Sequence, residues 1–192
     1  MILWYGLTNG GIPVNILVLG VGNLLLSDEG VGIRALEVIE KRYDIPAGVE
    51  ILDGGTSGME LLGYIQGRDA LIIIDAVSCE EPPGTIVRME GDQVPALFRK
   101  KISPHQLGLS DLLAAARLTD SLPKTVVLFG IEPMELGTGL DLSPKVAGVL
   151  EDLAALVAFE LESLGVREVR KARCRKLPAR AGSTTLRSTL AC

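Results

Sequence analysis

Cysteine and histidine are scarce in this sequence. Of the 192 residues, three are cysteines (Cys79, Cys174 and Cys192) and one is a histidine, His105. An odd number of scattered cysteines without a CxxC pair argues against a disulfide framework and against a cysteine-based zinc or iron–sulfur site. We therefore expect free thiols, as is usual in the cytoplasm.

Long hydrophobic runs and a secretion signal are also missing. The longest apolar runs, such as Ile16–Leu26 and Ala70–Ile74, are interrupted by Gly and Asn or are far shorter than the ~20 residues that cross a bilayer. The segment before the first expected strand lacks the positive n-region and the small-residue cleavage site of a secretory signal peptide. We expect no membrane span and a cytoplasmic protein.

A basic face for nucleic acid is absent from most of the chain. The net charge is −5, but residues 167–192 carry a surplus of +7, which leaves −12 for the rest. Nucleic-acid binders need a clustered basic face, so the acidic body argues against such a partner. The basic end could be an arm for RNA or membrane, but its Gly, Ser and Thr and its lack of apolar periodicity are typical of a disordered tail.

We therefore divide the chain into three parts. Residues 1–14 are an N-terminal extension, residues 15–166 form a single domain, and residues 167–192 form the basic, disordered tail. With 47% hydrophobic residues, the domain has enough apolar material for a full core. We expect a monomer that binds neither nucleic acid nor membrane.

Short apolar runs alternate with helical patterns along the domain. The strands expected are Asn15–Gly20, Val49–Leu52, Ala70–Ala76, Thr85–Met89 and Thr125–Ile131. The helices expected are Gly30–Tyr43, Met59–Gln66, Gly108–Arg117 and Ser143–Leu164, the last with a Ser-Pro start suited to capping. This alternation predicts an α/β fold, a three-layer α/β/α domain with a twisted, mainly parallel five-stranded sheet. Ligands of such sheets bind at the carboxyl ends of the strands.

Two acids, Asp28 and Glu29, follow the first strand. The preceding Gly20 and Gly22 suggest a nucleotide-binding loop, but a GxGxxG pattern would need Gly at Leu25, and the acids would repel a pyrophosphate. The alternative to a catalytic or ligand role is that Ser27 or Asp28 caps the next helix and that Glu29 favours its positive end.

The second and third strands also end in polar residues. Asp53-Gly54-Gly55 could bring the backbone close to a peptide substrate, or could be an ordinary loop with an Asx turn. Asp75 ends the third strand and must find water, a donor or a metal, since a buried carboxylate is costly without a partner. A loop hydrogen bond would satisfy it as well.

The only histidine, His105, follows Pro104, which restricts the backbone just before it. A single histidine is more often a packed or surface residue than a ligand. Glu29, Asp75 and His105 are far apart in sequence, but all three are expected at the same edge of the sheet.

Five segments together resemble the hydrogenase maturation proteases. They are Ile16-Leu-Val-Leu-Gly-Val-Gly-Asn23, Asp28-Glu29-Gly30, Asp53-Gly-Gly55, Ile74-Asp75-Ala76 and Ser103-Pro-His-Gln-Leu-Gly108. The resemblance runs from about Ile16 to Leu164, includes Val94–Phe98, and is greatest to the branch that processes membrane-bound uptake hydrogenases. The N-terminal extension and the basic tail lie outside it.

The resemblance implies a five-stranded α/β/α fold and an endopeptidase. Its partner would be the [NiFe]-hydrogenase large-subunit precursor, cut near its C-terminus, and nickel would be contributed by that substrate. The family's metal ligands fall on Glu29, Asp75 and His105, an oxygen and nitrogen set that accepts nickel and would also accept zinc.

Two catalytic routes are open. In one, a metal polarises a carbonyl or activates water. In the other, nickel only aligns the scissile bond, and a carboxylate such as Asp28 or Asp75 is the general base, as in an aspartyl protease. The alternative that is not an enzyme is a nickel-sensing chaperone, which would bind the precursor without cutting it.

Overall fold

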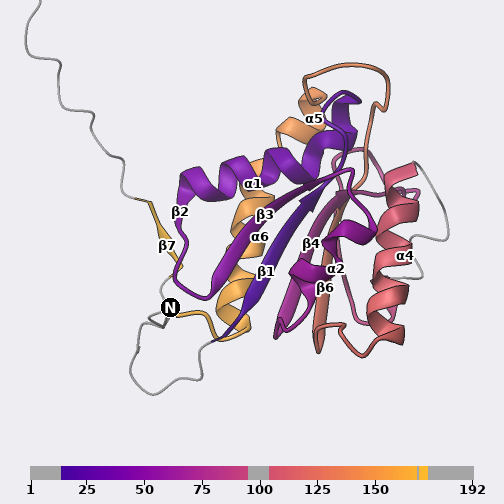
Figure 1. Ribbon diagram of the computed structural model, residues 1–192. Coiled ribbons are helices and arrows are strands. Elements are labelled where there is room, and N and C mark those ends of the chain that lie inside the picture. The colour runs from indigo at the N-terminus through magenta and orange to yellow at the C-terminus, as the bar shows by residue number, and fades with distance from the viewer. Residues whose placement is uncertain (1–13, 95–103, 168, 173–192) are drawn as a thin grey trace, which may run out of the picture.

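The computed structural model describes residues 14–94, 104–167 and 169–172. Its centre is a five-stranded sheet with the order β3-β1-β4-β6-β5 (Figure 1). The strands are β1 Ile16–Val21, β3 Val49–Gly55, β4 Ala70–Ala76, β5 Ile86–Glu90 and β6 Thr125–Ile131. The first four strands of this order pair in parallel, and β5 is antiparallel to β6. All five expected strands are present, and the mainly parallel sheet is confirmed.

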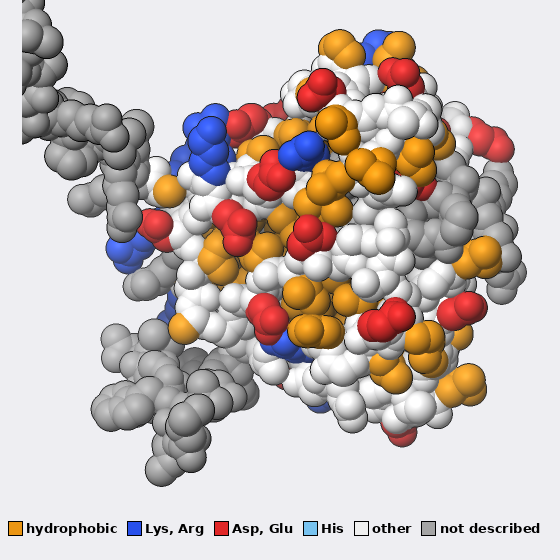
Figure 2. All heavy atoms as spheres, turned by 45° about the horizontal axis from the view of Figure 1, so that its top comes forward, with side chains coloured by type: hydrophobic (Ala, Val, Ile, Leu, Met, Phe, Trp, Pro, Cys, Tyr) orange, Lys and Arg blue, Asp and Glu red, His pale blue; other side chains and the backbone are white. Residues whose placement is uncertain are grey.

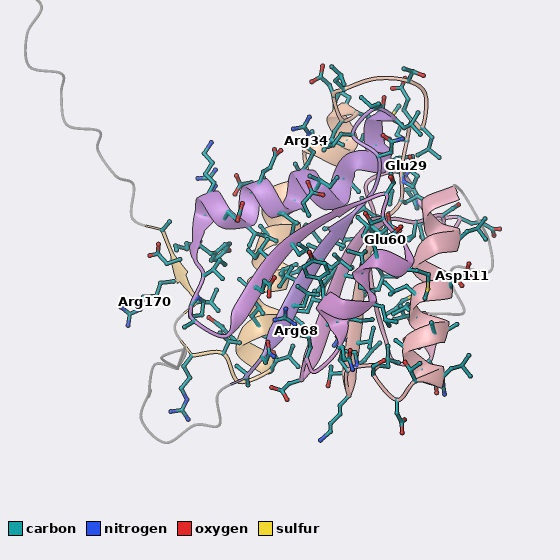
Figure 3. The ribbon with its side chains drawn as sticks, in the orientation of Figure 1. Glu29, Arg34, Glu60, Arg68, Asp111 and Arg170 are labelled. Carbon is teal, nitrogen blue, oxygen red and sulfur yellow. The ribbon has the colours of Figure 1, made fainter. Side chains whose placement is uncertain are left out.

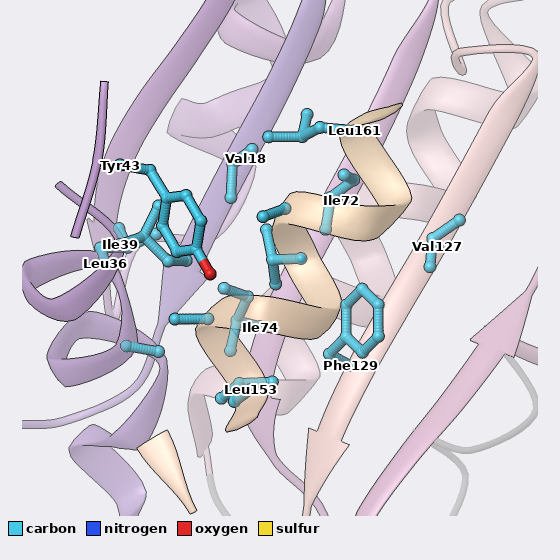
Figure 4. Close-up of a cluster of buried hydrophobic side chains, with 14 of the residues drawn as sticks. Val18, Leu36, Ile39, Tyr43, Ile72, Ile74, Val127, Phe129, Leu153 and Leu161 are labelled. Carbon is cyan, nitrogen blue, oxygen red and sulfur yellow. The ribbon is translucent and has the colours of Figure 1, made fainter. Parts of the chain in front are cut away.

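Helices cover both faces of the sheet (Figure 1). Helices α1 (Val31–Arg42) and α6 (Leu150–Ser163) lie on one face, and α2 (Leu62–Ile65) and α4 (Pro104–Leu118) lie on the other. The central strand β4 is buried along its whole length, which explains its uninterrupted apolar sequence. Its side chains alternate: Ile72 and Ile74 pack toward α6 (Figure 4), and Leu71 and Ile73 pack toward α4.

The helices differ from the expected ones in two places. The single helix expected over Ser143–Leu164 is two helices, α5 (Pro144–Ala147) and α6, because the chain turns at Gly148, a weak helix former. Ser143 does cap the first of them, since its Oγ accepts from the Val146 N–H at 3.5 Å. Helix α4 starts at Pro104 rather than Gly108, because a proline is tolerated in a first turn that needs no N–H donor. No helix among the described ranges is long and apolar enough to cross a membrane.

A second, small sheet was not expected. β2 (Tyr43–Asp44) and β7 (Arg170–Lys171) pair in antiparallel fashion, and the Ala172 N–H donates to the Arg42 carbonyl at 2.6 Å. β7 lies in the segment that the sequence assigns to the tail, so this part of the segment pairs with the domain. Residues 1–13 and 173–192 lie outside the described part of the chain.

Candidate active site

Asp75 is a fully buried carboxylate near the carboxyl end of β4. Its neighbours two positions away, Ile73 and Val77, pack on the α4 side of the sheet, so the alternation of a strand points Asp75 to the same side. Its partner across the sheet is Gly130 of β6. A Cβ at Gly130 would lie 2.1 Å from Val77 Cγ2, so a larger residue there would displace the Val77 side chain.

Glu29 is buried in the short turn η1 (Ser27–Gly30), which lies against β4. Figure 3 shows Glu29 at the end of the sheet toward which the parallel strands run. Gly22 allows this placement: its φ is +137°, and a Cβ there would lie 1.8 Å from the Glu29 carbonyl oxygen. Glu29 and Asp75 thus come from adjacent elements at the carboxyl edge of the sheet.

His105 lies in the first turn of α4, on the sheet face toward which Asp75 points. The start of α4 packs on the loop after β3, because a Cβ built on Gly58 lies 3.0 Å from the Gly108 Cα. The His105 side chain is outside the described part of the structure. Among the described side chains, no three of His, Cys, Asp or Glu form a metal-sized group. The convergence of Glu29, Asp75 and His105 therefore stays a prediction, and the structure places their three elements at one edge.

Asp28 holds a long loop in place. Its Oδ2 accepts from the Met134 and Glu135 N–H groups, each at 2.9 Å, and from the Ser143 hydroxyl at 2.8 Å. Its Oδ1 accepts from the Ser143 N–H at 2.7 Å. The helix-capping alternative is not observed, since no side chain caps η1 or α1. The catalytic role that the sequence suggests for Asp28 stays a prediction, and this geometry favours a structural one.

The Asp53-Gly54-Gly55 segment ends β3, at one edge of the sheet. Asp53 Oδ1 accepts from the Gly55 N–H at 2.8 Å, which is an Asx turn within its own loop. The neighbouring loop ends in η2 (Met59–Leu61), where the backbone N–H groups of Glu60 and Gly58 hold the pKa of Glu60 below its ordinary value. The Asp53 side chain is exposed, which leaves it accessible to a substrate.

Glu132 is a residue of the site that the sequence reading missed. It is buried directly after β6, and its carboxylate accepts from the Cys79 N–H at 2.5 Å and the Ser78 hydroxyl at 3.3 Å. It thereby holds the loop that follows Asp75. An acid directly after a buried strand is the same signal that identified Asp75, so the sequence contained the information needed to find it.

Comparisons with known proteins agree with this architecture. A family model described as hydrogenase maturation protease matches residues 33–160. The hydrogenase 2 maturation protease of Escherichia coli is 50% identical over 157 residues, which cover 81% of this chain and 96% of the relative. The hydrogenase expression/formation protein HupD of Rhodobacter capsulatus is 42% identical over 156 residues, which cover 80% of this chain and 74% of the relative.

Solved structures share the fold. The hydrogenase maturating endopeptidase HybD from E. coli superposes with a TM-score of 0.78 at 50% identity, covering 81% of this chain and 97% of that one. The [NiFe] hydrogenase maturation protease HybD from Thermococcus kodakarensis superposes with a TM-score of 0.63 at 28% identity, and the match covers 77% of this chain and 99% of that one. The chain therefore belongs to the hydrogenase maturation proteases, a family of endopeptidases that hydrolyse peptide bonds.

Proposed function

We propose that this protein removes the C-terminal peptide of a [NiFe]-hydrogenase large-subunit precursor, and that nickel carried by the precursor is recognised in the site. Family membership supports the class of reaction. The observation that carries the rest is a fully buried carboxylate, Asp75, beside the turn that holds Glu29 and on the sheet face that α4 covers. The cytoplasm is the proposed compartment and the precursor the proposed partner.

Glu29, Asp75 and His105 are the residues proposed to contact the substrate's nickel. Two carboxylates and an imidazole suit a borderline divalent ion, and three protein ligands leave positions open for groups of the substrate. Zinc suits the same donors, so the substrate, rather than the site, determines which ion is present.

Asp75 is the proposed general base in preference to Asp28. A base must accept a proton from the attacking water, and both oxygens of Asp28 already accept hydrogen bonds from the loop. In the proposed step, Asp75 takes a proton from water and the water oxygen bonds to the scissile carbonyl carbon. The C–N bond then breaks, and the proton passes to the leaving amine. Asp53, Gly54 and Gly55 would align the peptide beside this carboxylate.

The test is to incubate the purified protein with nickel-loaded and nickel-free precursor under chelating conditions and to detect the shortened subunit by mass spectrometry. We expect a preference for the loaded precursor of about 100-fold, which corresponds to about 2.7 kcal/mol. His105→Ala should reduce this preference, and Asp75→Asn should fold but not cleave. Asp152→Asn, at an exposed position of α6, is the matched control and should behave as wild type.

Three outcomes would count against the proposal. Equal cleavage of both precursors by the wild type would exclude nickel recognition. Full activity of Asp75→Asn would exclude its role as base. Tight binding of the loaded precursor without any shortening would indicate a chaperone instead of a protease.

A further inference from the structure

Large apolar side chains are exposed along one side of the carboxyl edge. Leu25 is 60% exposed, Met134 57% and Leu140 64%, and Leu136 is exposed as well. We call these four residues the apolar rim. Figure 2, which tilts this edge forward, shows hydrophobic side chains on this face with acidic and fewer basic side chains beside them. Monomeric proteins seldom expose several large apolar residues together without a binding role.

The two distant segments that carry the rim are joined by hydrogen bonds. The Ser27 N–H donates to the Gly139 carbonyl, and the Gly139 N–H donates to the Leu25 carbonyl, both at 3.0 Å. The Ser27 hydroxyl donates to the Gly137 carbonyl at 3.0 Å, and Asp28 accepts the bonds described above. Leu25 and Leu140 are thus neighbours across this junction.

The loop that carries most of the rim, residues 132–143, contains neither helix nor strand, yet its backbone is held at several points. Loops of this length are commonly functional. A surface that is ordered before binding loses less conformational entropy on binding. The exposure of Met134, Leu136 and Leu140 therefore belongs to a prearranged surface.

The rim is attached to the candidate active site at both ends. Leu25 precedes the turn that holds Glu29, and the loop begins at Glu132, directly after the strand that pairs with Asp75. Exposed acids, Glu135 and Asp141, lie within the same loop. The most complementary partner is a protein surface with an apolar protrusion bordered by basic residues.

We propose that the apolar rim is the docking surface for the folded body of the hydrogenase precursor, separate from the residues that receive its C-terminal peptide. This inference rests on the proposed function, since it takes the precursor as the substrate. The rim binds the body of the precursor, and the C-terminal peptide then extends from this bound body to Asp75. The rim therefore adds affinity for the body of the precursor without taking part in bond cleavage.

The test compares two triple variants of the full chain. The rim variant is Leu25→Ser, Met134→Ser and Leu140→Ser. The control is Leu118→Ser, Leu156→Ser and Phe159→Ser, three exposed apolar residues on the outer sides of α4 and α6. The Kd for immobilised nickel-loaded precursor is measured by biolayer interferometry, and cleavage at saturating precursor is measured in a single turnover.

The rim variant should raise the Kd at least about tenfold, as loss of an interface centre does, and leave the single-turnover rate unchanged. The control should change neither. High salt should weaken wild-type binding, because the acids at the rim are exposed. If the rim variant unfolds, the single variant Leu140→Lys, which keeps the other apolar residues, should also raise the Kd.

A Kd of the folded rim variant within about twofold of wild type would overturn the proposal. The proposal would also be overturned if the wild type sediments as a dimer, the rim variant sediments as a monomer, and the Kd for the precursor is the same for both. The rim would then bind a second copy of this chain. Binding that depends on the rim but is followed by no cleavage would instead support the docking surface and contradict the proposed function.

Discussion

At the residue scale, the most informative side chain is Asp28. A buried carboxylate is stable only when donors replace its water, and here four hydrogen bonds from Met134, Glu135 and Ser143 do so. Charge-assisted bonds of this kind are stronger than neutral ones. A single side chain thus holds both ends of the loop over residues 132–143.

Asp28→Asn should therefore destabilise the fold. The amide has the same shape, but its NH₂ group faces donors, and each buried donor left unsatisfied costs about 1–3 kcal/mol. For a domain of this size the Tm should fall by roughly 5 °C. Asp53→Asn is the control, because an amide oxygen can still accept from the Gly55 N–H. An unchanged Tm for Asp28→Asn with complete loss of cleavage would indicate that Asp28 is catalytic after all.

At the scale of elements, the start of α1 lies directly on the sheet. A Cβ built on Gly32 would lie 2.3 Å from the carbonyl oxygens of Ile74 and Val21, and one on Gly20 would lie 2.5 Å from the Gly32 carbonyl oxygen. Gly20, one of the two glycines that suggest a nucleotide-binding loop, therefore serves helix-to-strand packing. This packing positions the turn with Glu29 beside Asp75.

Gly32→Ala should destabilise the protein although alanine is the better helix former. The propensity gain is about 1 kcal/mol, but the new methyl group meets backbone atoms that cannot rotate away, and overpacking costs typically 1–3 kcal/mol or more. Gly63→Ala in α2 is the matched control, since no atom lies within 4 Å of its added Cβ. Urea unfolding should show a lower midpoint for Gly32→Ala and an equal or higher one for Gly63→Ala. Equal midpoints for both variants would show that α1 can shift on the sheet.

At the scale of the whole molecule, the two-stranded sheet of β2 and β7 joins the C-terminal segment to the domain. A two-stranded sheet of this size is marginal by itself, and both residues of β7 are exposed. Tyr43 of β2 belongs to the core between the sheet and α1 and α6, whereas Arg170 and Lys171 belong neither to the main sheet nor to either core.

Truncation after Arg167 should consequently leave processing unchanged and lower the Tm by only about 2–4 °C relative to truncation after Ala172. The small loss reflects the pairing of Tyr43–Asp44 with Arg170–Lys171 and the packing of the partly buried Val169 against the core. Calorimetry of the two truncated proteins and of the full chain measures it. A much larger loss on truncation after Arg167 would mean that the segment contributes more to the core than the edge contact of Val169, and a loss of processing would mean that it contributes to the site.

The sequence by itself determined the strands, the layers and the strand-end acid Asp75, because these depend on local periodicity and on the cost of burying charge. The same rule, an acid directly after a buried strand, also predicts Glu132, although the sequence reading did not apply it there. The tertiary structure alone decided what Asp28 does, since its partners lie more than 100 residues away. It likewise decided the β2–β7 pair and the apolar rim. Such contacts leave no local pattern, because they depend on which distant segments the folded chain brings together.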